Sequence, residues 1–293
     1  MYTVNSISEY LKFLEDIKHI PETTYFCGNF SFYRGQANIE WGLTPSLYRQ
    51  GLFKCESLLL REVRHLCPSE FENNRFDALV KMQHFGLPTR LLDATTNPLV
   101  ALYFACESIQ EINNDAAVYI FPDLPVLWSD DPMIDFFMDY IYGDIPHGIS
   151  IERMLEISTK KYANVANRPM PNNIFSFITH LTMPIYPVMP AKTNLRVDAQ
   201  DGTFFICGMK LCEKKSDKSK ETTEYYFESR EAFEYHRVCD NAQKLRVPAA
   251  VKRDILTQLD VLGINERRLF PDLSHQIKYA VDFVKNSYPE GLR

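Results

Sequence analysis

The segment from Met82 to Cys106, MQHFGLPTRLLDATTNPLVALYFAC, tells more about this chain than any other. A histidine, a Gly-Leu-Pro turn, a Thr-Arg pair, an aspartate and two threonines come directly before an apolar run of small residues. Asn97 suits a helix N-cap and Pro98 the first helical turn, and the run that follows is apolar all round, so we predict a buried helix. The polar residues before it predict a loop that carries a binding or catalytic site, because such sites often lie on loops held by a rigid scaffold.

A second polar cluster, Phe32-Tyr33-Arg34-Gly35-Gln36, lies upstream at the end of a predicted strand. A guanidinium at a strand end can bind a phosphate through two hydrogen bonds and does not lose its charge. Gly35 would let a ligand approach the backbone closely. The alternative is a structural salt bridge, for instance from Arg34 to Asp93, and the residues alone leave both interpretations open.

The polar part of the first segment contains Thr89, Arg90, Asp93, Thr95 and Thr96. Arg90 and Asp93 can pair as a clamp that shapes the loop. Thr95 and Thr96 lie just before the predicted helix, where free backbone N–H groups and the helix dipole favour a phosphate or a polarised hydroxyl. Either threonine can instead simply cap the helix.

Two further candidates are His84 and Gln200. His84 follows a predicted helix and can bind a ligand hydroxyl, although a lone histidine there is more often structural. Gln200 precedes Asp201-Gly202, which is a strong turn signal. The turn explains Asp201 but not Gln200, whose carboxamide can hold a sugar hydroxyl.

The composition narrows the class of protein. The chain has 293 residues, 45% of them apolar and 24% charged, with a net charge of −6, which are ordinary values for a globular protein. A non-specific nucleic-acid binder would usually be basic, so any such contact needs a local patch. The best candidate is KLCEKKSDKSK at 210–220, which we predict to be a loop between two strands, or else an ordinary solvated loop. Its lysines are Lys210, Lys214, Lys215, Lys218 and Lys220.

Several classes of site and location are not expected. The seven cysteines show no CxxC spacing, so we expect no zinc site or redox motif and no metal. Walker A, GxGxxG, HExxH and GxSxG sequences are absent. The N-terminal stretch lacks a basic start and an apolar run, and no segment has about 18 consecutive apolar residues, so we expect a cytoplasmic protein with reduced thiols.

The hydrophobic pattern predicts an α+β fold in one domain over 1–293, with a helical insertion at about 122–181. Ser6 and Glu9 have capping-box spacing before the first helix. Apolar periodicity predicts further helices over 57–66, 76–85, 99–105, 134–141, 152–162, 174–181, 247–262 and 273–284. Short apolar runs predict strands over 30–34, 117–121, 185–188, 203–207 and 224–229, the last two as a hairpin.

The two polar clusters resemble the characteristic blocks of the FRG domain family. The aromatic-Arg-Gly block is Phe32 to Gln36. The second block comprises His84, Gly86, Thr89-Arg90-Leu91-Leu92-Asp93, Thr95 and the ALYFA helix at 101–105. A third block has Gln200, Gly202 and Phe204, and a last one is LFPDL at 269–273. The resemblance runs from about residue 25 to 285 and covers the 122–181 segment poorly.

The FRG family is similar to ADP-ribosyltransferases, so the resemblance implies a mixed β-sheet core flanked by helices and NAD as co-substrate. By similarity Arg34 would hold the NAD phosphates, Thr95 or Thr96 would orient the nicotinamide ribose, and Gln200 would engage the ribose 2′-hydroxyl. The wider cofactor-binding set would be Tyr33, Arg34, Gly35, Gln36, His84, Thr89, Arg90, Asp93 and Tyr103. Many such transferases have a glutamate where this chain has Gln200, which can hydrogen-bond the ribose but cannot act as a general base. An exocyclic amine needs less deprotonation than a hydroxyl, so a glutamine is chemically tolerable there; alternatively Asp198, Asp201 or a carboxylate elsewhere supplies the base.

The resemblance further implies transfer of ADP-ribose to a nucleic-acid base, most of all adenine in single-stranded DNA, in a toxin-like or phage-defence setting. The 210–220 lysines would bind the DNA phosphates, and an antitoxin or ADP-ribosyl hydrolase would be a partner. Tyr33, Phe85 or Tyr103 would stack on nicotinamide or on the target base. The alternatives are a non-catalytic module that senses NAD or a nucleotide, an NAD glycohydrolase, and a transferase that modifies protein.

Overall fold

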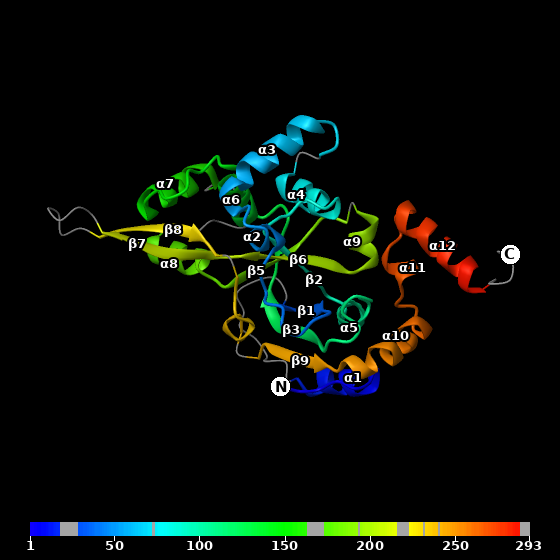
Figure 1. The fold of residues 1–293 in the computed structure, drawn as a ribbon. Coiled ribbons are helices and arrows are strands. Elements are labelled where there is room, and N and C mark those ends of the chain that lie inside the picture. Colours follow the sequence, from blue (N-terminus) through cyan, green and yellow to red (C-terminus); the bar gives the residue numbers. More distant parts are fainter. Residues whose placement is uncertain are drawn as a thin grey trace.

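The computed structural model describes residues 1–17, 29–71, 74–162, 173–192, 194–215, 223–230, 232–239 and 241–287. Their fold is α+β, as predicted, and is built on a mixed seven-stranded sheet in the order β4-β5-β6-β2-β1-β3-β9, with helices packed against it (Figure 1). All neighbouring strands in this sheet are antiparallel except β4 and β5. The strands are β1 Asn29–Gln36, β2 Leu91–Thr95, β3 Ala116–Pro125, β4 Leu127–Trp128, β5 Ile185–Met189, β6 Gly202–Cys207 and β9 Gln243–Val247.

The helices lie in two groups that make separate hydrophobic cores with different parts of the sheet. One group packs beside β5 and β6, and comprises α3 Glu56–Leu66, α4 Arg75–His84, α6 Pro132–Tyr142, α7 Ile151–Tyr162 and α8 Ile174–Leu181. The other packs beside β3 and β9, and comprises α1 Ile7–Asp16, α5 Pro98–Cys106, α10 Lys252–Val261 and α11 Glu266–Leu269. The short helices α2 Ser46–Arg49 and α9 Leu195–Ala199 and the final helix α12 Leu273–Ser287 complete the described helical elements, together with single 3-10 turns at Phe53–Cys55, Tyr235–Arg237 and Ala249–Val251.

The polar segment expected to be a loop contains the central strand β2. Asp93 is its one exposed residue, and Leu91, Leu92, Ala94 and Thr95 are buried. It pairs along its whole length with β6, from Leu91 opposite Ile206 to Thr95 opposite Gly202. An aspartate in the middle of five residues hides the strand pattern in the sequence, and only pairing with its neighbours makes the segment a strand.

The predicted helix starts are confirmed at the two strongest signals. The Ser6 side chain accepts a hydrogen bond from the Glu9 backbone N–H at 3.2 Å and begins α1. The Asn97 side chain accepts from the N–H groups of Leu99 and Val100, and Pro98 is the first residue of α5. The structure thus assigns the cap of α5 to Asn97, and neither threonine before it has that role.

Two other predictions near the C-terminal half were wrong. β6 does not form a hairpin with the strand at 224–229; that strand, β8 Thr223–Ser229, pairs with β7 Met209–Lys215 in a separate two-stranded sheet. The span from 247 to 262, predicted as one helix, is divided among three elements. Val247 is the last residue of β9, and after Pro248 come a 3-10 turn and then α10. Val247 belongs to the strand because β9 pairs with β3 at the edge of the sheet.

The segment 122–181 contributes β4, α6, α7 and α8, and α6 is buried along most of its length against α3 and α4. The six cysteines in the described part of the chain are free. Among the helices of the described ranges, none is both long and apolar enough to cross a membrane.

Candidate functional site

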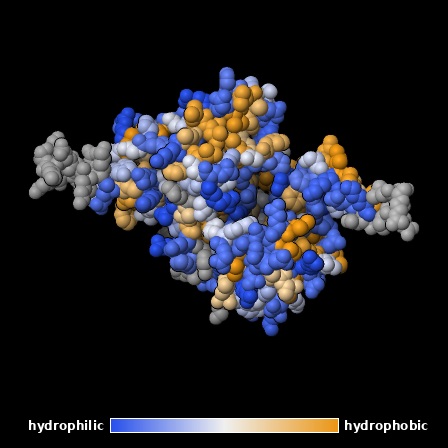
Figure 2. Space-filling view, viewed as in Figure 1, coloured by the Kyte–Doolittle hydropathy of each residue, from blue (hydrophilic) through white to orange (hydrophobic). Residues whose placement is uncertain are grey.

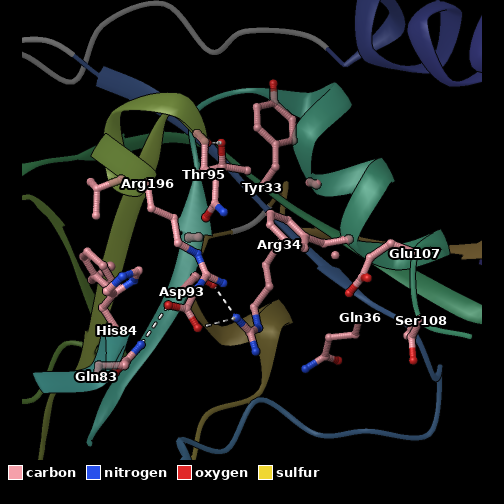
Figure 3. A pocket seen from close by; sticks show the side chains of 18 of the residues that line it. Tyr33, Arg34, Gln36, Gln83, His84, Asp93, Thr95, Glu107, Ser108 and Arg196 are labelled. Carbon is pink, nitrogen blue, oxygen red and sulfur yellow. Dashed lines mark hydrogen bonds and ion pairs between the residues drawn. The ribbon is translucent and has the colours of Figure 1, made fainter. Parts of the chain in front are cut away.

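The main cavity of the structure opens between the two central strands and helices from both groups. Its volume is about 550 Å³, which lies within the usual range for small-molecule sites. β1 and β2 contribute one wall, α4 and α9 another, and α5 with the residues after it a third (Figure 3). The middle of the face seen in Figure 2 is mainly hydrophilic. The polar residues that line the cavity are Tyr33, Arg34, Gln36, Arg49, Gln83, His84, Asp93, Thr95, Glu107, Ser108, Arg196 and Gln200.

The two sequence clusters meet at this cavity because β1 and β2 are neighbours in the sheet. The register between them consists of one pair, Tyr33 opposite Thr95, whereas β1 and β3 pair over most of β1. Arg34 joins the two strands next to that pair, since its Nη1 donates to the backbone carbonyl of Asp93. The short register leaves side chains of both strands facing the cavity.

Arg34 contacts Asp93, as one interpretation of the sequence proposed, and also lines the cavity. Its side chain is 14% exposed, and Nη1 lies 3.9 Å from Oδ2 of Asp93, whose side chain is 70% exposed. Burial lowers the pKa of Arg34 and Asp93 raises it, and a guanidinium titrates so far above neutrality that the charge remains. Its Nε is buried without a hydrogen-bond partner among the described residues. The bond to Asp93 therefore holds the guanidinium in place and leaves donor capacity unused.

Asp93 is held by the residues behind it. Gln83 Nε2 donates to Asp93 Oδ1 at 2.7 Å, and Thr89 Oγ1 donates to Gln83 Oε1. Thr89 Oγ1 also accepts from the Leu91 N–H at 3.1 Å. Thr89 is itself buried and does not line the cavity, so the side-chain contact that the structure shows for it is the one that orients Gln83.

Arg90 does not pair with Asp93, contrary to the clamp that the sequence suggested. Its guanidinium pairs with Glu56 of α3, with Nε 2.9 and 3.1 Å from the two carboxylate oxygens, and Nη1 donates to Ser229 Oγ at 3.3 Å. Both side chains of the Arg90–Glu56 pair are buried, and neither lines the cavity. Residues three apart along an extended chain point to opposite faces, so Arg90 and Asp93 are directed apart. The prediction that Arg90 contacts the cofactor is thus not supported by its position.

Thr95 and Thr96 stabilise the turn before α5. Thr95 Oγ1 donates to the Gln200 carbonyl at 2.8 Å and accepts from the Asn97 N–H at 3.0 Å. Thr96 contacts the Asp201 carbonyl through its own N–H at 3.0 Å. Thr95 lines the cavity, whereas Thr96 does not.

Gln200 has a structural contact that the sequence did not reveal. Its Nε2 donates to the Leu269 carbonyl at 3.0 Å, so this side chain joins α9 to α11, while the residue also lines the cavity. The other carboxylates considered near it lie outside the cavity. Asp198 pairs with Lys192 at 2.7 Å, and Asp201 accepts from Asn97 Nδ2 at 3.0 Å.

The aromatic-Arg-Gly cluster divides between the cavity and the packing of α5. A Cβ on Gly35 would lie 1.9 Å from the Ala101 carbonyl oxygen, so the close contact of β1 with α5 requires this glycine, which also lines the cavity. Gln36 Nε2 donates to the Gly42 carbonyl at 3.2 Å, and its Oε1 is buried with no partner in the described ranges. Tyr33 lines the cavity, whereas Tyr103 of α5 is buried in the core and does not.

Three charged residues of the cavity were not selected from the sequence. They are Arg49 at the end of α2, Arg196 in α9 and Glu107 just after α5. The only signal for Arg196 was its place in the RVDAQDG segment, and nothing in local spacing pointed to the other two. Their proximity depends on how α2, α5 and α9 pack around β1 and β2.

Glu107 is a carboxylate in a site that disfavours its charge. Burial raises its pKa, and Glu266 of α11 raises it further, whereas Arg196 and Lys278 lower it. It is the C-cap of α5, where the helix dipole also disfavours an anion. Among the described residues its side chain has no hydrogen-bond or ion-pair partner, so its oxygens are free to meet a ligand. Figure 3 shows it across the cavity from Asp93.

His84 ends α4 and faces the cavity. Its pKa is lowered mainly by burial and then by Arg196, and Asp272 partly offsets this. The imidazole is therefore neutral at neutral pH and can accept a proton or a hydrogen bond. Within the described chain no group of histidine, cysteine or carboxylate side chains is arranged to hold a metal ion.

The lysines predicted to bind nucleic acid lie on or beyond the separate two-stranded sheet. Lys210 is exposed on β7, and Lys214 and Lys215 end that strand instead of forming a loop. Lys218 and Lys220 lie outside the described residues. In Figure 1 the β7–β8 hairpin projects at the left, whereas α9 of the cavity lies on the right. Lys210 does not line the cavity.

Comparison with known proteins identifies the part of the chain that builds most of this site. Residues 29–114 match the family model of the FRG domain. The matched range runs from β1 through α5 and includes Arg34, His84, Asp93 and Glu107. No curated protein and no solved structure matches the sequence.

Proposed function

Because this chain carries an FRG domain at residues 29–114, whose polar strands line a charged cavity, we propose that it is an NAD-dependent ADP-ribosyltransferase. Its acceptor would be a nucleic-acid base, with adenine in single-stranded DNA as the first choice. The observation that carries the proposal is the charge arrangement of the cavity: three arginines together with one carboxylate that has no partner among the described residues. In such a site the arginines can bind the diphosphate of a ligand, and the carboxylate can lie near a cationic ring of the same ligand.

The arginines support binding of a diphosphate. Arg34 is fixed by Asp93 and keeps an Nε that no described residue pairs with. Arg196 stacks on the Phe270 ring at 4.5 Å and, in the described part of the chain, has no carboxylate partner. Arg49 bonds to the Thr44 carbonyl at 3.2 Å and lowers the pKa of Arg34 through charge repulsion. Like charges held together at one cavity are stabilised when an anion binds between them.

Glu107 supplies the opposite charge. In the proposed reaction the bond between ribose C1′ and nicotinamide nitrogen breaks, and its electron pair stays on nicotinamide. Positive charge then develops on the ribose, and a carboxylate that lines the cavity stabilises that charge. We assign this role to Glu107 in place of Gln200, because Gln200 is neutral and its amide is bound to Leu269.

Glu107→Gln is expected to slow nicotinamide release and to change its pH dependence. Because the pKa of Glu107 is raised, we expect the wild-type rate to fall on acidification with a midpoint above pH 4.5, the pKa of an ordinary glutamate. The glutamine variant cannot ionise, so this acid limb should disappear while the remaining rate is low at every pH. Rates of nicotinamide release measured from about pH 4 to 8 without nucleic acid, at intervals of about 0.5 unit, test this. A wild-type acid limb that persists in Glu107→Gln would assign the titration to another group.

Labelled NAD tests the proposed function directly. Purified protein would be incubated with NAD and, separately, with single-stranded DNA, duplex DNA, RNA or bulk protein, and both label transfer and free nicotinamide would be followed. Label on single-stranded DNA supports the proposal, and mass spectrometry then names the base. Nicotinamide release without a labelled acceptor would indicate a glycohydrolase, and NAD binding without turnover would indicate a sensing module.

The β7–β8 hairpin gives a separate prediction on DNA binding. Replacing Lys210, Lys214, Lys215, Lys218 and Lys220 with glutamine should reduce the salt dependence of single-stranded DNA binding. Each lysine–phosphate pair that the substitution removes should lower the slope of log K against log salt by about 0.7. Fluorescence anisotropy between about 50 and 300 mM salt, where screening by ions changes strongly, would measure the slope. An unchanged slope would exclude the hairpin from the DNA interface.

A further inference from the structure

A smaller cavity adjoins the main one and shares part of its wall. Its volume is about 270 Å³, and Val80, His84 and Arg196 line both cavities. The other residues that line this side cavity are Asp77, Lys81, Phe85, Ala191, Asn194, Leu195 and Asp272. α4 forms one wall of the side cavity, the chain leading into α9 forms a second, and Asp272, just before α12, forms a third. A group bound there would lie next to the contents of the main cavity.

We propose that this side cavity binds the acceptor, a nucleobase that carries an exocyclic amine, and that His84 takes the proton which the amine releases. The proposal rests on the proposed function and names the second substrate site of that reaction. His84 lies at the junction of the two cavities, so it contacts both the ribose side and the acceptor side.

The rim of the side cavity offers a flat apolar surface. Phe85 is 76% exposed and meets the His84 ring edge-to-face, with centroids 5.0 Å apart. Leu195, on the facing wall, is also largely exposed. Neither side chain is needed for core packing at that exposure, and an exposed aromatic ring is a platform on which bases of single-stranded nucleic acid stack. Arg196 adds positive charge that suits the attached phosphates, whereas Lys81 of the same cavity is paired with Glu70 at 3.6 Å.

The surroundings of His84 suit a proton acceptor. Burial and Arg196 lower its pKa, so its ring begins neutral, and no hydrogen bond to a described residue occupies its nitrogens. His275 acts in the same direction as Arg196. Asp272 has the opposite effect and raises the pKa of His84. Hydrogen bonds from Ser274 and His275 lower the pKa of Asp272, so its carboxylate stays ionised. Asp272 therefore stabilises the imidazolium that would form.

The carboxylate of Asp272 also has unused capacity. Oδ1 accepts from Ser274 Oγ at 2.6 Å and from the His275 ring at 2.7 Å, while Oδ2 is buried without a partner among the described residues. A buried acceptor without a donor destabilises the free protein, and a donor on a ligand that reaches it after a small side-chain rotation removes that cost. An exocyclic amine provides such donors. The second carboxylate of the cavity, Asp77, is bound to the Ala191 N–H.

The chemical step balances without a further reactant. The amine nitrogen forms a bond to ribose C1′ as the bond from C1′ to nicotinamide breaks, and the electron pair of the broken bond stays on the nicotinamide nitrogen. The amine proton passes to an imidazole nitrogen of His84 and then to water. The products are the ADP-ribosylated base, nicotinamide and a proton.

Phe85→Ala is the first test, with Phe175→Ala as its matched control. Phe175 of α8 is 78% exposed and lies outside both cavities. Loss of one stacking platform should raise the KM for a single-stranded oligonucleotide about tenfold, and the KM for NAD is measured beside it. Phe175→Ala should match wild type in both KM values. Equal oligonucleotide KM values for wild type and Phe85→Ala would overturn the acceptor site, as would a rise confined to the KM for NAD, since the side cavity would then hold part of NAD.

His84→Asn tests the proton acceptor. Transfer to the oligonucleotide should fall and lose the acid limb below pH 6.5 that nicotinamide release without DNA does not show, so that only the limb assigned to Glu107 remains. Asp272→Asn should lower the pH of the His84 limb, because the charge that favours imidazolium is gone. A limb unchanged in both variants would overturn the role of His84. Oligonucleotide binding measured by anisotropy keeps the two proposals distinct. If the wild-type protein does not turn over NAD but binds the oligonucleotide more tightly than Phe85→Ala does, the base-binding site stands and the transferase function is rejected.

Discussion

Arg34→Ala is expected to reduce NAD turnover by at least on the order of 100-fold with the protein still folded. The guanidinium is fixed by the Asp93 carbonyl and faces the cavity, so its removal takes away charge-assisted bonds to the diphosphate. Two such bonds at about 1.5 kcal/mol each correspond to that factor. Nicotinamide release at saturating NAD, together with NAD binding by calorimetry, would measure the loss.

Two further measurements separate ligand binding from folding. Circular dichroism and thermal unfolding should show a cooperative transition for Arg34→Ala, because the contacts of its side chain with described residues are one hydrogen bond and one loose ion pair, both to Asp93. Asp93→Asn keeps Arg34 and its bond to the Asp93 carbonyl, so it should retain NAD binding. If Arg34→Ala unfolds the chain, or if it folds and keeps full turnover, Arg34 is structural and the assignment to the diphosphate is wrong.

Arg90→Ala is expected to have the opposite phenotype, with a large loss of stability. The side chains of Arg90 and Glu56 are 5% and 4% exposed, and the variant leaves the Glu56 carboxylate buried without a counter-charge. Removing one partner of a buried pair costs about 3–5 kcal/mol. Burial alone would lower the pKa of Arg90, but the charge and hydrogen bonds of Glu56 outweigh it and raise the pKa, in keeping with a strongly coupled pair. Urea unfolding followed by circular dichroism measures the change.

The exposed pair Arg153–Glu156 of α7 provides the matched control. Its side chains are 60% and 41% exposed, so Arg153→Ala should leave the urea midpoint almost unchanged. The double variant Arg90→Met, Glu56→Leu should recover much of the stability, since apolar residues of similar size often replace a buried ion pair at little cost. If Arg90→Ala is as stable as Arg153→Ala, the pair is not a major source of stability.

The contrast between these two arginines shows what local sequence cannot distinguish. Both stand next to polar residues, and both belong to blocks that resemble the FRG family. Arg34 faces a cavity because β1 has β2 beside it over a very short register, whereas Arg90 faces α3 and finds Glu56. Which face of a strand meets solvent, a helix or a cavity depends on the neighbouring elements.

The sequence by itself determined the features that depend on a few neighbouring residues. The caps at Ser6 and Asn97, the apolar helix after Pro98, the α+β class and the FRG blocks at 29–114 were all accessible from short-range patterns. These follow from backbone hydrogen bonding and side-chain periodicity, which act within a few turns of chain.

The tertiary structure alone decided the features that depend on distant segments. β2 is a strand because β6 pairs with it, and Val247 lies in β9 because β3 pairs with it. Arg49, Glu107 and Arg196 come from α2, the end of α5 and α9, and they share one cavity because those elements pack around the central strands. Such contacts depend on the free energy of the whole packed arrangement, which no short window of sequence contains.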